Sequence, residues 1–268
     1  MAKERYYYFY DDRNDDFANS GIDGKPTPPD YEYYPKNLIY RIFKPILNRL
    51  ILIILFIPAC IIMKGLHVHN AKVLRNRDRK RGYFVFGNHT TYVGDAVMQP
   101  FMAFPHEVYT VVNPDAISIK FAGTIIRILG AMPNPSSRLT YVRFMEATER
   151  MYRDGNPIVV YPEAHIWPKY NKIRNFADVS FNLPVKLGAP CFVKSTVYHA
   201  DRKGHTTAEV WYDGPIYPNP DLPAKQAQRD LRDRVYAKMC ERCADSELDS
   251  RYHYIKVDSP DKVRMEIK

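Results

Sequence analysis

The sequence predicts an α/β protein with a largely parallel central sheet flanked by helices, preceded by an N-terminal membrane-associated helical segment. Downstream of Arg81, short β-rich runs alternate with helical stretches, which is the pattern of βαβ units. Upstream, residues 50–63 carry no charge. The chain has 268 residues, of which 46% are hydrophobic and 26% are charged, so one large domain fits its length. This composition excludes a disordered chain, collagen and a polytopic membrane protein.

The first region, residues 1–36, is predicted to form an irregular, Tyr-rich, acidic arm. It holds eight acidic and five basic side chains. Pro26, Pro28 and Pro29 disfavour regular structure, and the tyrosines are expected to pack the arm against the domain. The charge balance reverses in residues 37–82, which hold ten basic side chains and one acidic side chain. Positive charge is therefore concentrated around the apolar run.

Residues 37–82 are predicted to anchor the protein to a membrane at its cytoplasmic face. The run 50–63, LILIILFIPACIIM, has fourteen residues, whereas a spanning helix needs about 20. We therefore expect a re-entrant or interfacial segment unless Arg49 and Lys64 extend it by snorkelling, and Pro58 favours a broken helix. The basic residues favour anionic lipid headgroups and the cytoplasmic side. A buried core helix is the alternative, and no nucleic acid partner is expected because no recognition motif accompanies the basic residues.

The rest of the chain is predicted to divide into a folded domain at 83–245 and a C-terminal tail at 246–268. Four cysteines are too few for a disulfide framework, so a reducing compartment is expected. The lone C-x-x-C at Cys240 and Cys243 lacks the second pair that a structural zinc site needs, and no metal is predicted. Patterning places strands at 83–86, 107–112, 158–161, 191–198 and 207–212, and helices at 116–129, 141–152 and from Pro223.

Residues 87–96, GNHTTYVGDA, carry the strongest local signal for chemistry. They follow an apolar strand, and open α/β sheets bind ligands at the carboxyl ends of such strands. The Asp95 carboxylate can hydrogen-bond one imidazole nitrogen of His89 and stabilise the imidazolium, which leaves the other nitrogen to take a proton from a hydroxyl. This is a general base without a nucleophile of its own, and the sequence has no G-x-S-x-G elbow. A helix-capping Asp95 is the alternative interpretation.

Four blocks in order resemble the glycerolipid acyltransferases typified by lysophosphatidic acid acyltransferase. Asn88 and His89 match the family's opening Asn-His block. The later blocks are FAGTIIRILGAMPNPSSR at 121–138, VVYPEAHIWP at 159–168 and VKLGAPCFVKSTVY at 185–198. They resemble, in turn, a helix ending in Leu-Gly-x-Ile-Pro followed by an Arg, a block around Pro-Glu, and a Gly-x-Pro that leads into a strand. The resemblance covers about residues 60–215.

The resemblance implies acyl transfer from a thioester to a lipid hydroxyl. His89 would remove the hydroxyl proton and Asp95 would steady the imidazolium, while the thiolate leaves without a covalent acyl-enzyme. The implied donor is acyl-CoA or an acyl carrier protein thioester, which is a co-substrate, and no cofactor is implied. The expected partners are membrane lipids, a lysophospholipid-like acceptor and the thioester donor.

The resemblance also implies residues that bind the acceptor. Arg138 is expected to contact its phosphate, and Arg127 in the preceding helix is the weaker candidate. Glu163 is expected to bind the acceptor's glycerol hydroxyl or to brace the site. His165 is expected to line a pocket, and a structural histidine is the alternative. Arg174 is among the basic residues expected to replace a phosphate-binding Arg that the family has in its third block and this sequence lacks.

Two departures from the family pattern bear on these expectations. The family usually has four residues between His and Asp, whereas residues 90–94 make five here, and on a helix one extra residue rotates Asp95 by about 100°. Gly94 permits a looser turn that restores the contact. The third block has Glu163-Ala-His-Ile in place of Glu-Gly-Thr-Arg. Two alternatives stay open: a non-catalytic lipid-binding or scaffold protein on the same fold, and an acyltransferase for a non-phosphate lipid acceptor.

Overall fold

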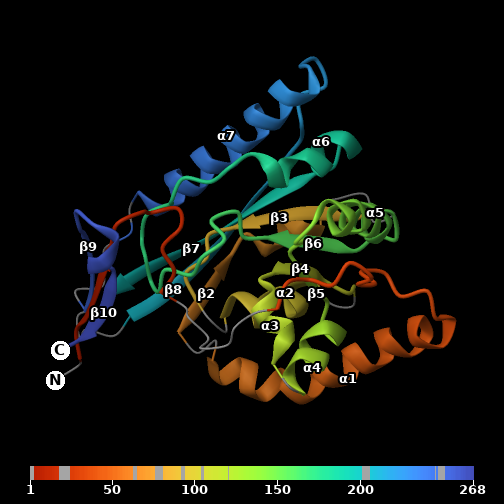
Figure 1. Cartoon of the computed structure of the whole chain (residues 1–268), viewed down its shortest axis with the longest axis horizontal. Helices are drawn as coiled ribbons and strands as arrows, with labels where there is room; N and C mark the ends of the chain where they lie inside the picture. Colours follow the sequence, from red (N-terminus) through yellow and green to blue (C-terminus); the bar gives the residue numbers. More distant parts are fainter. Residues whose placement is uncertain are drawn as a thin grey trace.

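The molecule is built around a seven-stranded sheet with helices on both faces (Figure 1). The computed structural model describes residues 3–17, 25–62, 65–75, 81–91, 94–103, 106–119, 121–200, 206–244, 246 and 251–268. The strand order is β2-β8-β7-β3-β6-β4-β5. The strands are β2 (Leu66–His69), β3 (Tyr83–Gly87), β4 (Tyr109–Val112), β5 (Ala131–Pro133), β6 (Pro157–Val160), β7 (Cys191–Ala200) and β8 (Thr206–Ile216).

The prediction of a largely parallel sheet is confirmed. β7, β3, β6, β4 and β5 run in one direction, β8 is antiparallel to β7, and β2 is parallel to β8. Because the five parallel strands end at the same edge, the residues that follow them gather there. The helices are α1 (Leu38–Ile62), α2 (Gly94–Ala103), α3 (Pro114–Ser118), α4 (Ala122–Ile128), α5 (Arg138–Arg153), α6 (Asn182–Leu187) and α7 (Ala224–Cys243), with 3-10 turns at Ala71–Arg75, Val179–Phe181 and Pro260–Lys262.

The central strand β3 is buried on both faces. Phe84 and Phe86 pack in the core that α5, α6 and α7 cover, whereas Tyr83 and Val85 pack in the core on the α2 side. Successive side chains of a strand point to opposite faces, so an unbroken apolar run such as YFVF is what a strand between two helical layers requires.

Two helices differ from their predictions. The single helix predicted at 116–129 is two helices, α3 and α4, because Phe121 between them has a φ of 60°, a left-handed conformation that a right-handed helix cannot contain. The helix break predicted at Pro58 is wrong, since α1 continues through it. A proline removes one backbone hydrogen bond and bends a helix more readily than it ends one when the flanking turns are intact.

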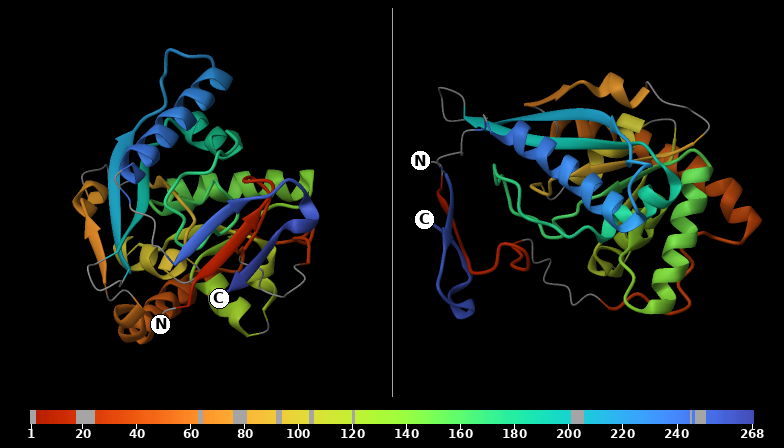
Figure 2. Two further views of the ribbon diagram at one scale, coloured as in Figure 1. Left: turned by 90° about the vertical axis from the view of Figure 1, so that its left-hand side faces the viewer. Right: turned by 90° about the horizontal axis from the view of Figure 1, so that it is seen from above.

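A second, three-stranded sheet joins the two ends of the chain (Figure 2). β1 (Arg5–Phe9) lies between β9 (Tyr252–Lys256), which is parallel to it, and β10 (Arg264–Ile267), which is antiparallel. The arm is therefore not irregular at residues 5–9, as the sequence predicted. Tyr7 is buried and stacks on Tyr254 with ring centroids 4.8 Å apart. The pairing joins segments some 250 residues apart in the chain, and local patterning carries no signal for such a contact.

Candidate active site

The candidate site lies at the carboxyl edge of the sheet, around the ends of three neighbouring strands. His89 follows β3, Glu163 follows β6, and Lys194 lies on β7 directly beside Gly87 of β3. β7, β3 and β6 are adjacent in the sheet. The strand order thus brings together side chains that are more than 70 positions apart in the sequence.

His89 and Asp95 form the hydrogen-bonded pair that the sequence predicted. The Nδ1 of His89 lies 3.0 Å from Oδ2 of Asp95. The Asp95 side chain is 3% exposed and that of His89 is 19% exposed, so the carboxylate is shielded while the ring reaches the surface. Tyr161 stacks on the imidazole, with ring centroids 4.5 Å apart, and limits its rotation. The carboxylate therefore fixes the Nδ1–H tautomer, and Nε2 is left as the hydrogen-bond acceptor.

The extra residue between His89 and Asp95 is accommodated before the helix. Residues 88–91 are not helical and α2 begins only at Gly94, so the rotation expected for a helix does not apply. The backbone N–H groups of Thr90 and Thr91 each donate to Oδ2 of Asp95 at 3.2 Å. In return the Asp95 N–H donates to Oγ1 of Thr91 at 3.0 Å. The Thr91 side chain therefore caps a backbone N–H in the first turn of α2, while the Asp95 carboxylate holds both His89 and the backbone that precedes the helix.

Asn88 secures the strand end from which His89 projects. It is fully buried, and its side-chain amide donates to the Thr196 carbonyl at 2.9 Å and accepts from the Thr196 N–H at 2.8 Å. These bonds continue the pairing of β3 with β7 beyond the last ladder residues. The paired amide therefore holds the backbone of His89 against β7.

Glu163 braces the backbone of His89 and is itself held by Arg174. Its carboxylate accepts the His89 N–H at 2.9 Å and the Arg174 N–H at 2.8 Å, and a guanidinium nitrogen of Arg174 lies 3.6 Å away. Both side chains are buried. Burial raises the pKa of Glu163, and Arg174 offsets part of that rise. The guanidinium also lies over the Trp167 ring at 4.9 Å, so Arg174 is enclosed and not directed to the surface.

The N-terminal arm closes over this brace. Arg174 donates to the backbone carbonyls of Asp12 and His165, and the Trp167 indole N–H donates to the Asp15 carbonyl at 2.9 Å. The His165 ring contacts Asp16 at 3.3 Å. The loop that carries Glu163 is therefore covered by residues from the start of the chain.

The structure does not bring Arg138 or Arg127 against His89. Arg138 is exposed at the start of α5 and follows β5, which is three strand positions, about 14 Å, from β3. β5 and β3 both end at the carboxyl edge of the sheet, so Arg138 lies at the same edge as His89. Arg127 ends α4 near the opposite edge, where it interacts with Tyr31 of the arm.

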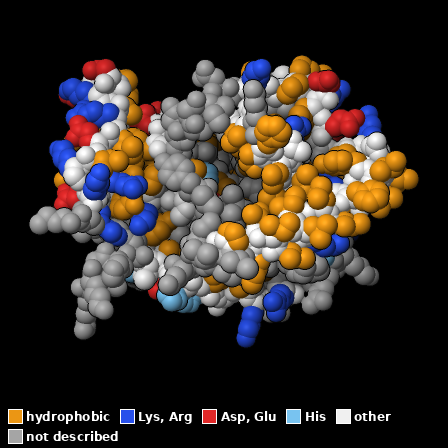
Figure 3. All heavy atoms as spheres, turned by 90° about the horizontal axis from the view of Figure 1, so that it is seen from below, with side chains coloured by type: hydrophobic (Ala, Val, Ile, Leu, Met, Phe, Trp, Pro, Cys, Tyr) orange, Lys and Arg blue, Asp and Glu red, His pale blue; other side chains and the backbone are white. Residues whose placement is uncertain are grey.

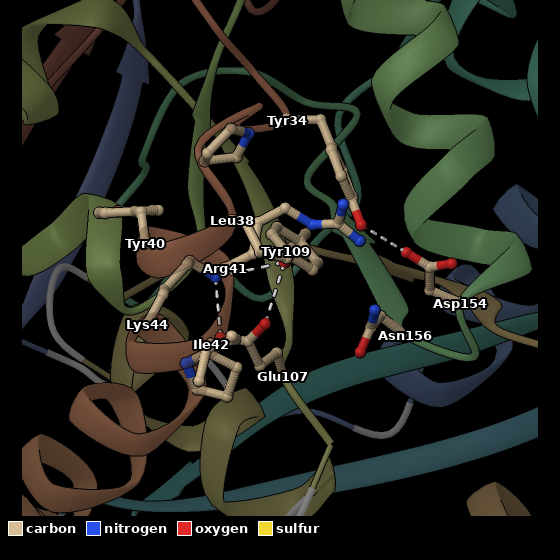
Figure 4. A pocket seen from close by; sticks show the side chains of 12 residues that line it. Tyr34, Leu38, Tyr40, Arg41, Ile42, Lys44, Glu107, Tyr109, Asp154 and Asn156 are labelled. Atoms are coloured by element: carbon tan, nitrogen blue, oxygen red, sulfur yellow. Dashed lines mark hydrogen bonds and ion pairs between the residues drawn. The ribbon is translucent and has the colours of Figure 1, made fainter.

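A cavity of about 270 Å³ lies at that opposite, amino edge (Figure 4). Glu107, just before β4, and Asn156, just before β6, line it together with Arg41 and Lys44 of α1. Since the strands begin here, this cavity is separate from the His89 site. It marks the place where α1 is attached to the domain.

Sequence reasoning missed two residues of the site, Lys194 and Tyr161. Lys194 is fully buried and its Nζ forms an ion pair with Oδ1 of Asp95. The Tyr161 hydroxyl donates to the Asp95 carbonyl at 2.9 Å. Burial alone would raise the pKa of Asp95, but Lys194 and His89 hold it well below its usual value. A lysine inside an otherwise uncharged strand, CFVKSTVY, was the available signal.

The C-x-x-C cysteines lie on α7 as ordinary helix residues. Cys243 is buried, and burial raises its pKa to about 12, while Cys240 is partly exposed. Within the described ranges, no group of three or more His, Cys, Asp or Glu side chains could hold a metal ion.

The fold and the site together define an α/β protein with a hydrogen-bonded histidine–aspartate pair at the carboxyl edge of its sheet. The Acyltransferase family model matches residues 65–210, more than half of the chain, and the chain therefore belongs to the Acyltransferase family. The predicted resemblance to an acyltransferase family is confirmed. Among solved structures, the chain is similar to the 1-acyl-sn-glycerophosphate (LPA) acyltransferase PlsC from Thermotoga maritima, with a TM-score of 0.46 and 20% identity over 66% of this chain and 71% of that one. No curated protein sequence matches the chain.

Proposed function

We propose that the protein transfers an acyl group from a thioester, acyl-CoA or an acyl carrier protein, to the hydroxyl of a lysophospholipid-like acceptor. The observation that carries this proposal is the 3.0 Å contact of His89 with Asp95 in a chain of the Acyltransferase family. A partly exposed imidazole with a buried carboxylate behind it is suited to taking a proton from an alcohol.

The reaction follows from the arrangement of the pair. Nε2 of His89 accepts the hydroxyl proton as the acceptor oxygen attacks the thioester carbonyl. Asp95 keeps the proton on Nδ1 and stabilises the imidazolium. A C–O bond forms, the C–S bond breaks, and the proton passes from the imidazolium to the leaving thiolate. The acyl group moves directly to the acceptor, so no covalent acyl-enzyme is needed.

The surface of α1 supports an acceptor drawn from a membrane. Its outward face is apolar and strongly exposed, with Ile54 at 73%, and Phe121, directly before the neighbouring α4, is 90% exposed (Figure 3). A continuous exposed apolar patch marks an interaction surface, and lipid acceptors are loaded without extraction through water when such a surface lies on the bilayer. None of the helices that the structure describes has the length and apolar content needed to span a bilayer. The patch comprises Leu38, Ile39, Ile42, Phe43, Ile46, Leu47, Leu50, Ile53, Ile54 and Phe56 of α1 with Phe121, directly before α4, and Ile125 of α4.

The inner face of α1 carries two buried polar side chains, Lys44 and Asn48, before the buried Leu52. Lys44 is buried and its Nζ donates to Glu107 at 2.8 Å and to the Tyr109 hydroxyl at 3.2 Å (Figure 4). One turn later Asn48 is buried and donates to the Ile128 carbonyl at 3.0 Å. A water-facing helix buries apolar residues and exposes polar ones, so α1 is built for an apolar surrounding on its outer side. We therefore propose that the outer face of α1 contacts a membrane, and the basic residues in 37–82 favour its cytoplasmic leaflet.

Charge on the apolar patch is expected to weaken membrane binding. The double substitution Ile53→Glu with Ile54→Glu puts two carboxylates on the outer face of α1, and we expect at least a tenfold loss of binding to anionic vesicles in co-sedimentation. Val179→Glu is the matched control, because Val179 is a similarly exposed apolar residue outside α1 and α4. Equal binding by both variants and the unchanged protein would remove α1 as the membrane contact.

Arg138 is proposed as the ligand for the acceptor's phosphate, since a guanidinium suits phosphate and this one is exposed on the carboxyl side of the sheet. Arg138→Ala is expected to raise KM for lysophosphatidic acid about tenfold or more, because a charge-assisted contact contributes about 1.5–3 kcal/mol. Arg127→Ala, at the far edge, is the control and is expected to leave KM unchanged. A KM that hardly changes in Arg138→Ala would count against a phosphate contact there.

The enzymatic proposal is tested by following both products of the reaction. The full chain in mixed micelles is given acyl-CoA with lysophosphatidic acid, lysophosphatidylcholine or monoacylglycerol, and free thiol is compared with acylated lipid. We expect one thiol per acylated lipid, with a phosphate-bearing acceptor preferred. Turnover with monoacylglycerol but with neither phosphate-bearing lipid would favour an acyltransferase for a non-phosphate acceptor. Vesicle binding without thiol release for any acceptor, with acyl carrier protein thioesters tried as donors, would favour the scaffold alternative.

A further inference from the structure

Lys194 is a charged side chain with no access to water. It lies on β7 with 0% of its side chain exposed, and its Nζ forms an ion pair with Oδ1 of Asp95. The Tyr161 hydroxyl is 3.5 Å from Nζ. Burying an ammonium group costs desolvation free energy, and the ion pair with Asp95 offsets part of that cost.

We propose that Lys194 is a positioning residue that neutralises Asp95, so that His89 is backed by a pair with no net charge and remains available to accept a proton. This inference rests on the proposed function, in which His89 is the base. It gives the two oxygens of the carboxylate separate parts: Oδ1 is held by Lys194, while Oδ2 orients the imidazole.

The need for such a residue follows from the burial of Asp95. A lone carboxylate in a low-dielectric site strongly favours the protonated imidazole beside it. A base that already carries the proton cannot take one from the acceptor. With the ammonium on its other oxygen, the carboxylate still accepts the Nδ1–H bond and still stabilises the imidazolium, but less than a lone carboxylate would.

The other titratable groups around the pair keep a constant charge. Burial, reinforced by Asp95, raises the pKa of Tyr161 and of Tyr198, and burial likewise raises that of Tyr212, so all three stay neutral. Glu163, which contacts the backbone of His89, is paired with Arg174. Among the residues that the structure describes around the pair, the charges that change the state of His89 are thus those of Asp95 and Lys194.

The test compares pH profiles of kcat/KM for three variants. Lys194→Met removes the charge in a similar volume, and Lys194→Gln keeps a hydrogen-bond donor for Asp95 without the charge. In both we expect the acidic limb to move to higher pH by about one unit or more, so that activity measured on that limb falls about tenfold for each unit of the shift and recovers in alkaline buffer. Asp95→Asn with Lys194→Met removes both charges, and its acidic limb is expected near the position of the unchanged protein, on a lower plateau.

A merely structural Lys194 would give a different result. Activity would then fall by one factor at every pH in the single variants, and that outcome, or loss of the folded state in both of them, overturns the proposal. The ring ¹⁵N shifts of His89, assigned by comparison with His89→Ala, provide a readout that does not depend on turnover. If the unchanged protein shows no transferase activity, the proposed function fails, and a titration of His89 unaltered by Lys194→Gln would separately refute the inference.

Discussion

Replacing His89 with alanine is expected to lower kcat/KM for acyl transfer by about 10²- to 10⁴-fold, the usual contribution of a positioned general base. The fold should survive, because Asp95 keeps Lys194 and the backbone N–H groups of Thr90 and Thr91 as partners. Rates of thiol release by the purified variant, with its far-UV spectrum and melting temperature, check this expectation.

The matched control is His69→Ala. His69 lies on β2, where it stacks on Trp211 and contacts Glu209, and β2 is three strand positions, about 14 Å, from β3. We expect this variant to retain the activity of the unchanged protein. If His89→Ala were as active as His69→Ala, the imidazole of His89 would not be the base. The result would then favour a structural role for the His89–Asp95 pair.

Replacing Arg174 with methionine is expected to cost about 3–5 kcal/mol of unfolding free energy, because it leaves the buried Glu163 carboxylate without its counter-ion. For a protein of this size that corresponds to a fall in Tm of about 6–20 °C in thermal unfolding. Removing the guanidinium lets burial raise the pKa of Glu163 further. The folded state then holds a proton that the unfolded state has released, so the deficit should grow as pH rises and shrink in mildly acidic buffer.

Two comparisons isolate the buried pair as the cause. Glu163→Gln combined with Arg174→Met removes both charges and is expected to recover part of the lost stability. Arg153→Met breaks an exposed pair with Glu149 and is expected to change Tm little, because surface ion pairs contribute about 0–1 kcal/mol. An equal effect of Arg174→Met and Arg153→Met would show that Arg174 does not hold Glu163 in solution.

The parallel sheet was predictable because its signals are local. The strands at β3, β6 and β7 are apolar runs bounded by turns, and each was placed to within a few residues. His89 and Asp95 are also close in sequence, so their pairing could be proposed from spacing alone. The single helix predicted at 116–129 was wrong because the left-handed backbone at Phe121 carries no compositional mark.

The sequence by itself thus determined the class of fold, the strand that carries His89 and the carboxylate that could orient it. Only the tertiary structure decided that Lys194 compensates this carboxylate, that Arg174 braces Glu163 and is not exposed to substrate, and that α1 turns its apolar side outward. Patterning encodes which face of an element is apolar, because that depends on residues within a few turns. Which distant side chains meet depends on strand order and on the packing of layers, and these are properties of the whole chain.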